Sequence, residues 1–147
     1  MDQPDAEEAL SRLERFVGEW TMRARADTWE GEGTTTFEWH PDRAHLLQRG
    51  SVDHPDAPNS LSVIGCDGAK DTYTQLYSDE RGVCRVYDMS FDGTTWTLER
   101  QGDPFAQRYI GTFSDDGGTI TGQWLVDDDG NGYRLDFDVV LERRTGE

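Results

Sequence analysis

Hydrogen-bonding and aromatic side chains recur at alternate positions of several strand-like segments. The set is Trp39, Gln75, Tyr77, Arg85, Tyr87, Trp96, Arg100, Gln107, Tyr109 and Trp124. Side chains two residues apart on a strand point to the same face, so each run would project together. An arginine that faces an apolar space needs an anionic or hydrogen-bonding partner, and a ligand carboxylate would supply one. The pattern predicts a small-molecule site in which Arg85 or Arg100 pairs with an acid group, the tyrosines donate hydrogen bonds and the tryptophans form walls.

Two other interpretations of this set stay open. A β-bulge reverses the facing of every later residue on its strand. The arginines would then lie on a solvated outer surface beside the many acidic residues. Alternatively, the inward facing is right, but the aromatic rings fill the interior and leave no room for a ligand.

Residues for nucleophilic or acid–base catalysis are sparse. A serine or cysteine nucleophile needs a base and an orienting acid beside it, and no Gly-x-Ser-x-Gly motif occurs. Cys66 and Cys84 are interpreted as wall residues. Glu38 and Glu99, the nearest carboxylates to the arginines, are out of phase with the apolar faces. We predict no catalytic residues and favour a protein that is not an enzyme, although that question stays open.

A metal site would need several histidine, cysteine or carboxylate ligands that converge. His40 and His54 each precede a proline at a turn, and His45 lies between them in sequence. The acidic turn 127–131 lacks the spaced ligands and terminal glutamate of a calcium loop. We therefore predict surface histidines, an acidic hairpin, no metal and no cofactor.

A short helix and ten strands are the elements that would position these residues. Residues 5–16 predict a helix, since Asp5 can cap it and Leu10, Leu13 and Phe16 form an apolar stripe. This stripe would lie across a barrel mouth. Beyond it the apolar period changes to two, and turn residues bound the candidate strands. The candidate strands are 17–26, 33–41, 44–52, 60–66, 71–78, 82–91, 94–101, 104–113, 118–126 and 131–143.

The segment 131–143 shows the clearest alternation. Five apolar side chains share one face, which would be the inner one, and Arg134, Asp136, Asp138 and Glu142 share the other. The apolar side chains are Tyr133, Leu135, Phe137, Val139 and Leu141. Because the connections between strands are too short for parallel crossovers, neighbouring strands should pair antiparallel. The predicted fold is an all-β, ten-stranded up-and-down barrel over 17–143 in a single domain of residues 1–147, with the helix near one end.

Composition limits the partners and the compartment. The net charge of −16 should repel nucleic acid and anionic membranes, because binding either depends on neutralising phosphate charge. It predicts a monomer or a weak homodimer. Cys66 and Cys84 are predicted on strands two apart, beyond disulfide reach, which predicts free thiols and a cytoplasmic location. The start of the chain lacks the apolar core of a signal peptide, and no apolar run is long enough for a membrane span.

The ends of the predicted barrel carry a family resemblance. Gly18 and Trp20 open the first strand, and Arg143 and Arg144 end the last. This arrangement resembles the calycin-type barrels, which include the lipocalins, the fatty-acid-binding proteins and the nitrobindin-like proteins, the last being closest in size. The resemblance implies that a basic side chain of the final strand covers the tryptophan by a cation–π contact.

Longer stretches resemble a group of uncharacterised bacterial lipocalin-like domains of unknown function. They are 36–39, 54–58, 81–91 and 107–117. The glycine-rich extension and C-terminal histidine of nitrobindin-like haem proteins have no counterpart, since the last histidine is His54. The resemblance therefore implies a barrel for small molecules but no haem.

Together these observations predict non-enzymatic binding of a small apolar molecule, with an anionic group as an option, inside the barrel. Two alternatives remain. The first is a calycin-type cyclase or isomerase that shapes a hydrophobic metabolite by proximity and desolvation. The second is an interaction domain without a ligand, which a solid interior would favour.

Overall fold

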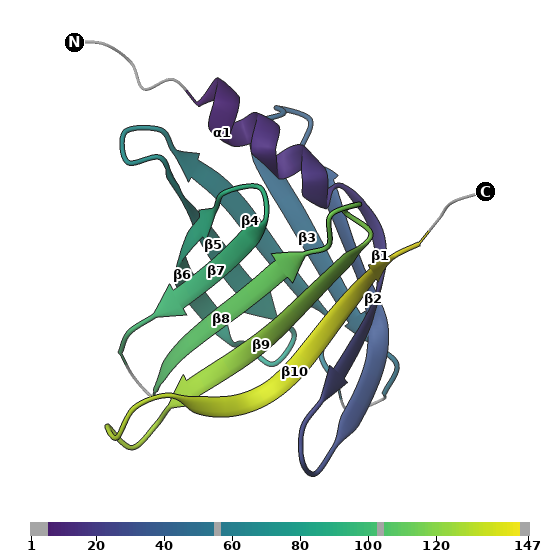
Figure 1. Ribbon diagram of the computed structural model, residues 1–147, viewed down its shortest axis with the longest axis vertical. Helices are drawn as coiled ribbons and strands as arrows, with labels where there is room; N and C mark the ends of the chain where they lie inside the picture. Colours follow the sequence, from purple (N-terminus) through teal and green to yellow (C-terminus); the bar gives the residue numbers. More distant parts are fainter. Residues whose placement is uncertain (1–5, 55–56, 103–104, 145–147) are drawn as a thin grey trace.

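Ten antiparallel strands close into a barrel in the computed structural model, which describes residues 6–54, 57–102 and 105–144. The strands are β1 (Gly18–Arg25), β2 (Glu30–Trp39), β3 (His45–Val52), β4 (Ser60–Asp67), β5 (Thr72–Asp79), β6 (Cys84–Phe91), β7 (Thr95–Arg100), β8 (Ala106–Phe113), β9 (Thr119–Asp127) and β10 (Arg134–Arg143). Each strand pairs with its neighbour in sequence, and β1 pairs with β10 (Figure 1). The predicted ten-stranded up-and-down barrel is confirmed.

Alternation of side chains places one face of each strand inside. In β6, Tyr87, Met89 and Phe91 are buried while the residues between them are exposed, and β8 buries Tyr109 and Phe113 in the same way. This period of two is what a barrel wall with one wet face requires. Closure leaves no free sheet edge to pair with another chain.

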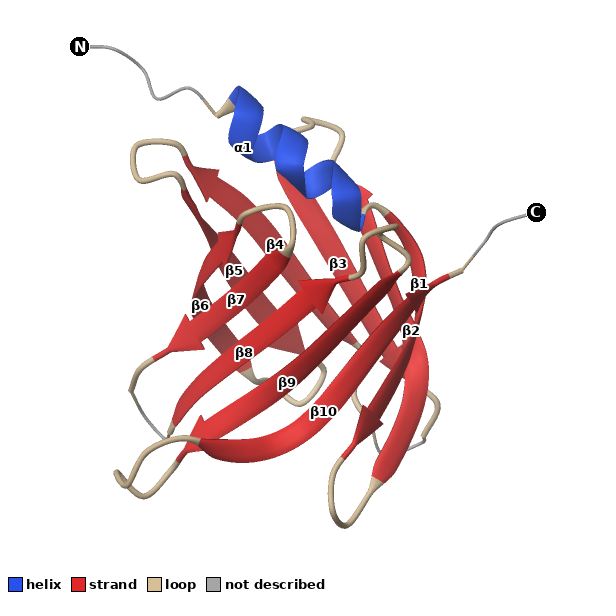
Figure 2. Cartoon of the chain, viewed as in Figure 1, coloured by secondary structure: helices blue, strands red, loops and turns tan. Residues whose placement is uncertain are grey.

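One end of the barrel is covered by helix α1 (Glu7–Arg12) and a 3₁₀ turn, η1 (Leu13–Phe16), as Figure 2 shows. Leu13 and Phe16 are fully buried. The predicted helix over 5–16 is therefore two shorter pieces, and Asp5, its predicted cap, lies outside the described residues, as do Pro55, Asp56 and Pro104 of the predicted turns and strands. No helix in the described part of the chain is long and apolar enough to cross a membrane.

The interior beneath the helix is a packed aromatic cluster centred on Phe16. Its ring centroid lies 5.1 Å from Phe37, 4.8 Å from Phe91, 4.9 Å from Trp96 and 5.1 Å from Phe113. These separations are typical of aromatic pairs that stabilise a core. The helix end of the barrel is therefore solid.

The predicted contact between Trp20 and an arginine of the final strand is made by Arg143. Its guanidinium lies 4.2 Å from the centre of the Trp20 ring and donates a hydrogen bond of 2.6 Å to the Val17 carbonyl. Gly18 leaves room for it, since a Cβ there would lie 2.7 Å from Arg143 Nη1. Arg144 instead lies 3.8 Å from Glu19. One arginine thus joins the first strand to the last.

The pairing of β10 with β9 contains a register shift between Leu135 and Phe137. Leu135 is half exposed (50 %), and the ring of Tyr133 lies against Arg108. The predicted inward facing of Tyr133 and Leu135 is therefore wrong. The register shift reverses the face of the sheet to which side chains before it point, relative to those after it. Phe137, beyond the shift, faces inward as predicted.

Candidate ligand-binding cavity

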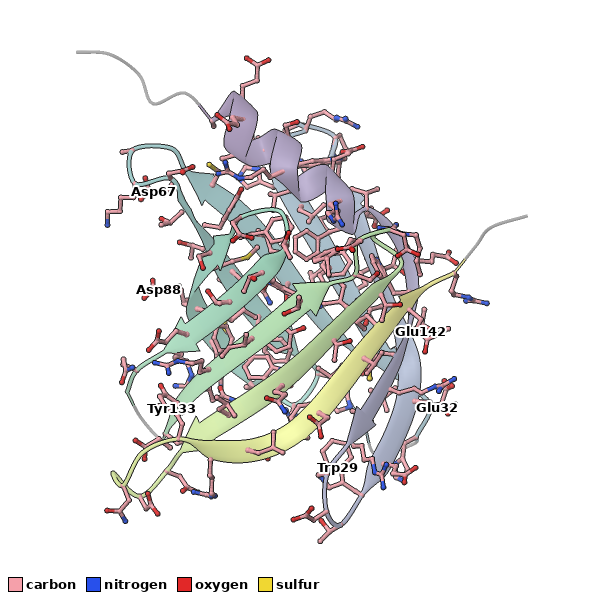
Figure 3. All side chains as sticks on the ribbon, in the orientation of Figure 1. Trp29, Glu32, Asp67, Asp88, Tyr133 and Glu142 are labelled. Carbon is pink, nitrogen blue, oxygen red and sulfur yellow. The ribbon has the colours of Figure 1, made fainter. Side chains whose placement is uncertain are left out.

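The half of the barrel away from α1 is hollow. A cavity of about 670 Å³ lies between the inner faces of the strands and extends to Trp29, in the turn between β1 and β2. Figure 3 labels Trp29 at the end of the molecule opposite α1. Cavities of roughly 300–1,000 Å³ suit small organic ligands. The aromatic cluster around Phe16 closes the inner end, because Trp96 belongs both to that cluster and to the cavity lining.

A row of aromatic rings runs along one side of the cavity. Successive ring centroids lie 5.2 Å apart from Trp29 to Phe137, 6.4 Å from Phe137 to Trp124, 5.2 Å from Trp124 to Tyr109 and 4.8 Å from Tyr109 to Trp96. Trp96, Tyr109, Trp124 and Phe137 come from the neighbouring strands β7 to β10, and we call these four the aromatic wall. Planar apolar groups find their best partners on such a surface.

Two glycines leave space for the Tyr109 ring within the aromatic wall. A Cβ at Gly111 or at Gly122, which face each other on β8 and β9, would collide with the Tyr109 phenol. Burial raises the pKa of Tyr109 far above its usual value, because the phenolate would be desolvated. Tyr109 is therefore a neutral phenol near pH 7.

Polar side chains line the opposite side of the cavity. Thr35, Gln48, Ser62 and Gln75 come from the neighbouring strands β2 to β5, and we call these four the polar wall. Gln48 is directly across from Ser62, and Gln75 Nε2 donates a hydrogen bond of 3.4 Å to Ser62 Oγ. Ser62, Gln75 and Thr35 are buried (3 %, 4 % and 5 % exposed), so their polar groups face the cavity and not bulk water.

Three polar atoms in the cavity lining have no hydrogen-bond partner among the described residues. They are Oε1 of Gln48, Oε1 of Gln75 and the indole nitrogen of Trp96. Buried polar atoms in folded proteins are almost always bonded to protein or to water. Two acceptors on one wall and one donor on the other therefore lack a partner among the described residues.

Charged side chains of the lining lie at the open end. They are Glu30, the first residue of β2, and Arg81, in the turn between β5 and β6, and the imidazole of His54 lies at the same end. Arg81 donates to Asp79 at 2.7 and 3.2 Å, and the Tyr77 hydroxyl donates to the same carboxylate at 2.7 Å. Hydrogen bonds from Arg81 hold the pKa of Asp79 well below its usual range. Burial, and then the bond to Asp79, raise the pKa of Tyr77 to about 12.

The predicted arginines form a separate cluster on β6 to β8. The side-chain oxygen Oε1 of Gln107 accepts hydrogen bonds from Tyr87 (2.8 Å), Arg85 (3.2 Å) and Arg100 (3.3 Å). Both guanidinium groups also lie over the Phe105 ring, at 5.0 and 5.2 Å from its centroid. None of these residues is part of the cavity lining, and the pairing of Arg85 or Arg100 with a ligand acid stays a prediction.

Trp39 lies at the helix end of the barrel. Its indole nitrogen donates a hydrogen bond to Glu14 in η1, and it does not line the cavity. Five of the ten predicted ligand-binding residues do line it, and their role in binding stays a prediction. These five are Gln75, Tyr77, Trp96, Tyr109 and Trp124.

Several lining residues were not among the site residues predicted from the sequence. They are Trp29, Thr35, Gln48, Ser62 and Phe137. Phe137 was placed on an inward face but was not named as a site residue. The polar members carried too little signal, because the strands from which they come mix polar and apolar residues on both faces. In β4, Ser62 faces the interior while Leu61 is exposed (42 %).

Other candidate groups lie away from the cavity. Glu38 pairs with Arg49, and Glu99 pairs with Arg108 at 3.0 Å, in both cases through largely solvent-accessible side chains. Cys66 is half-buried and Cys84 is exposed, and both are free. Among the described residues, no three histidine, cysteine or carboxylate side chains converge as metal ligands would.

Comparison with known proteins supports the fold. No family model and no curated protein matches the chain. Among solved structures, Rv2717c from M. tuberculosis is similar with a TM-score of 0.67 and 15% identity, over 93% of this chain and 98% of that one. The S-type phycobiliprotein lyase CPES from Guillardia theta is similar with a TM-score of 0.56 and 14% identity, over 99% of this chain and 100% of that one. At these identities the likeness establishes a shared barrel fold and nothing finer.

Proposed function

We propose that this protein binds a small, largely apolar molecule non-covalently in the open half of its barrel. The cavity of about 670 Å³ carries the proposal. Its aromatic wall offers apolar contact area, and its polar wall offers a few convergent hydrogen-bonding groups, which is the usual composition of a ligand site. A protein that used the barrel only as a scaffold would gain stability by filling this space.

We further propose that the ligand has no acid group in its buried part. Among the described residues, Arg81 is the arginine that lines the cavity, and its guanidinium already forms an ion pair with Asp79. A ligand carboxylate would therefore lie at the open end, beside Arg81 and His54. The proposal includes membership of the lipocalin-like barrels, a cytoplasmic location, supported by the free Cys66 and Cys84, and a monomer or weak homodimer, supported by the net charge of −16.

Native mass spectrometry of the protein as expressed, followed by denaturing extraction, tests the proposal directly. We expect a stoichiometric organic ligand, or an empty protein that binds the uncharged fluorescent probe N-phenyl-1-naphthylamine. An empty protein that also fails to bind this probe would overturn the proposal.

A blocking variant locates the bound probe. Ala24 is buried in the cavity lining, and its cross-strand neighbours are Gly31 and Val139. Ala24→Trp would extend an indole into the cavity, so we expect probe affinity to fall at least about tenfold. The adjacent outward residue supplies the control, Arg23→Trp, which should leave probe binding unchanged. Equal loss in both variants would place the probe outside the barrel.

A further inference from the structure

We propose that the ligand is an uncharged, planar heteroaromatic ring system with both hydrogen-bond donors and acceptors on its edge. The inference rests on the proposed function and names the chemical class that the two opposed walls would select.

Planarity follows from the aromatic wall. Trp96, Tyr109, Trp124 and Phe137 succeed one another across four adjacent strands at centroid separations of 4.8 to 6.4 Å. The rings of Trp124 and Phe137 are close to parallel, at 30°. The Tyr109–Trp124 and Trp96–Tyr109 pairs are tilted by 45° and 68°. A flat conjugated ligand would stack on one ring face and contact the edges of its neighbours, whereas a flexible acyl chain would lose conformational freedom to do so.

Donors on the ligand follow from the polar wall. The unpartnered oxygens of Gln48 and Gln75 are acceptors, and a ligand N–H or O–H would satisfy each of them. Gln75 is 4 % exposed, so its amide oxygen is shielded from bulk water. The Ser62 hydroxyl oxygen accepts a hydrogen bond from the amide nitrogen of Gln75. This bond orients the Gln75 amide group.

An acceptor on the ligand follows from Trp96. Its ring closes the inner end of the cavity, its side chain is 3 % exposed, and its indole N–H has no partner among the described residues. Indole nitrogen only donates. A carbonyl oxygen or ring nitrogen that reaches this depth would take that hydrogen bond.

Neutrality follows from the charges of the lining. The polar and aromatic walls consist of uncharged residues, and the charged lining residues Glu30 and Arg81 lie at the open end, at the start of β2 and in the turn between β5 and β6. Burying an unpaired charge between the two walls would be strongly unfavourable. Hydrogen bonds, not ion pairs, would therefore set the specificity of the inner cavity.

Three fluorescent probes of similar size separate these features. Lumichrome is a flat, uncharged ring system with N–H and carbonyl groups, phenanthrene is a flat hydrocarbon, and anthracene-carboxylate is a flat anion. We expect lumichrome to bind at least about tenfold more tightly than either of the others in a fluorescence titration. Tighter binding of phenanthrene or of anthracene-carboxylate would overturn the inference and leave the proposed function standing.

Variants assign the hydrogen bonds. Gln75→Leu removes an acceptor and Trp96→Phe removes a donor while keeping a ring, so each should weaken lumichrome about tenfold and change phenanthrene less than about twofold. Thr74→Val, on the exposed face of β5, is the matched control and should change neither. Gln48→Leu repeats the acceptor test should Gln75→Leu fold poorly, as judged by circular dichroism.

The outcomes separate the two levels of the proposal. Equal effects of Gln75→Leu on lumichrome and phenanthrene would show that the amide does not bond the ligand and would overturn the inference. If none of the three probes binds, the inference is overturned. If N-phenyl-1-naphthylamine fails as well and native mass spectrometry finds no ligand, the proposed function falls with it.

Discussion

At the scale of single residues, the cavity lining gathers buried polar atoms that lack hydrogen-bond partners among the described residues. A buried polar atom without a partner costs about 1–3 kcal/mol, yet Gln48, Gln75 and Trp96 each hold one in the lining. Leucine, methionine or phenylalanine at these positions would avoid that cost. Local violations of this kind concentrate at functional sites, and a bound molecule would remove all of them together.

Tyr109 and the glycines beneath it form a unit whose parts can be tested separately. Gly122→Ala should destabilise the protein by about 1–3 kcal/mol, because the new methyl group would collide with the Tyr109 ring. In a Tyr109→Leu background the collision is gone, so the same change should cost much less. A double-mutant cycle from urea denaturation measures this coupling.

Gly31 provides the control for that cycle. A Cβ at Gly31 would meet Val52 at 3.7 Å, an ordinary contact. Gly31→Ala should therefore leave stability unchanged or raise it slightly. A cost for Gly122→Ala that persists in the Tyr109→Leu background would contradict the packing described here.

The aromatic wall was more predictable from sequence than the polar wall, of which Gln75 alone was among the predicted residues. Trp96, Tyr109 and Trp124 could be found from sequence, because large aromatic residues in phase on a strand have few other places to go. Gln48 and Ser62 could not, since a polar side chain on an alternating strand is normally assigned to the solvent. Arg85 and Arg100 were predicted to pair with a ligand acid group, and that role stays a prediction. Their guanidinium groups are bonded by Gln107 and stacked on Phe105, contacts that become visible only once the strands are assembled.

At the scale of elements, the strands were predictable because turn residues separate them and their side chains alternate. The irregularity in β10 was not, because every second residue from Tyr133 to Leu141 is apolar and this spacing continues through it. Its position is set by pairing with β9, where the register shifts. The outer face of the sheet near this point therefore carries Leu135, an apolar residue that alternation alone assigns to the interior.

Closure of the barrel depends on Arg143. Replacing it with methionine keeps apolar volume but removes the stacking on Trp20 and leaves the carbonyls of Val17 and Arg15, each bonded at 2.6 Å, without a donor. We expect Arg143→Met to destabilise the protein by about 2 kcal/mol or more in urea denaturation. Arg144→Met is the matched control. Arg144 lies 3.8 Å from Glu19 with both side chains largely exposed, so its loss should cost about 0–1 kcal/mol. Similar losses in the two variants would contradict this assignment.

The hairpin between β5 and β6 should respond to pH through Asp79. Its pKa is depressed in the folded protein, mainly by hydrogen bonds from Arg81. The carboxylate therefore contributes stability above its unfolded pKa of about 4, and this contribution is lost as the pH falls toward the lower folded pKa. Asp79→Asn should be less stable than the native protein at pH 7, and the difference should shrink progressively below about pH 4. Urea midpoints across this range measure it, with Asp27→Asn, in the β1–β2 turn, as control. A difference that stays constant with pH would refute the linkage.

At the scale of the whole molecule, the barrel is divided into a solid end and a hollow end. Phe16 and its aromatic neighbours pack the interior beneath α1, while the opposite half holds the cavity. Strands are therefore supported on their inner face at one end and face open space at the other. Packing of this kind determines which parts of a protein open locally and which open only on global unfolding.

Amide hydrogen exchange should reveal this difference between the solid end and the hollow end of the barrel. Amides in the halves of β1, β2 and β10 beside the cavity should exchange through local opening, whereas those next to Phe16 should exchange only when the whole protein unfolds. A molecule bound between the two walls would give the open half an inner face to pack against. Saturation with a cavity ligand should therefore slow exchange in the open half, because opening there would expel the ligand, and it should slow exchange through global unfolding by at least the same factor. The blocked variant Ala24→Trp, exposed to the same ligand, controls for binding at the surface. Uniform protection along the strands, with or without ligand, would mean that the barrel opens as one unit and that the empty half is as well supported as the filled one.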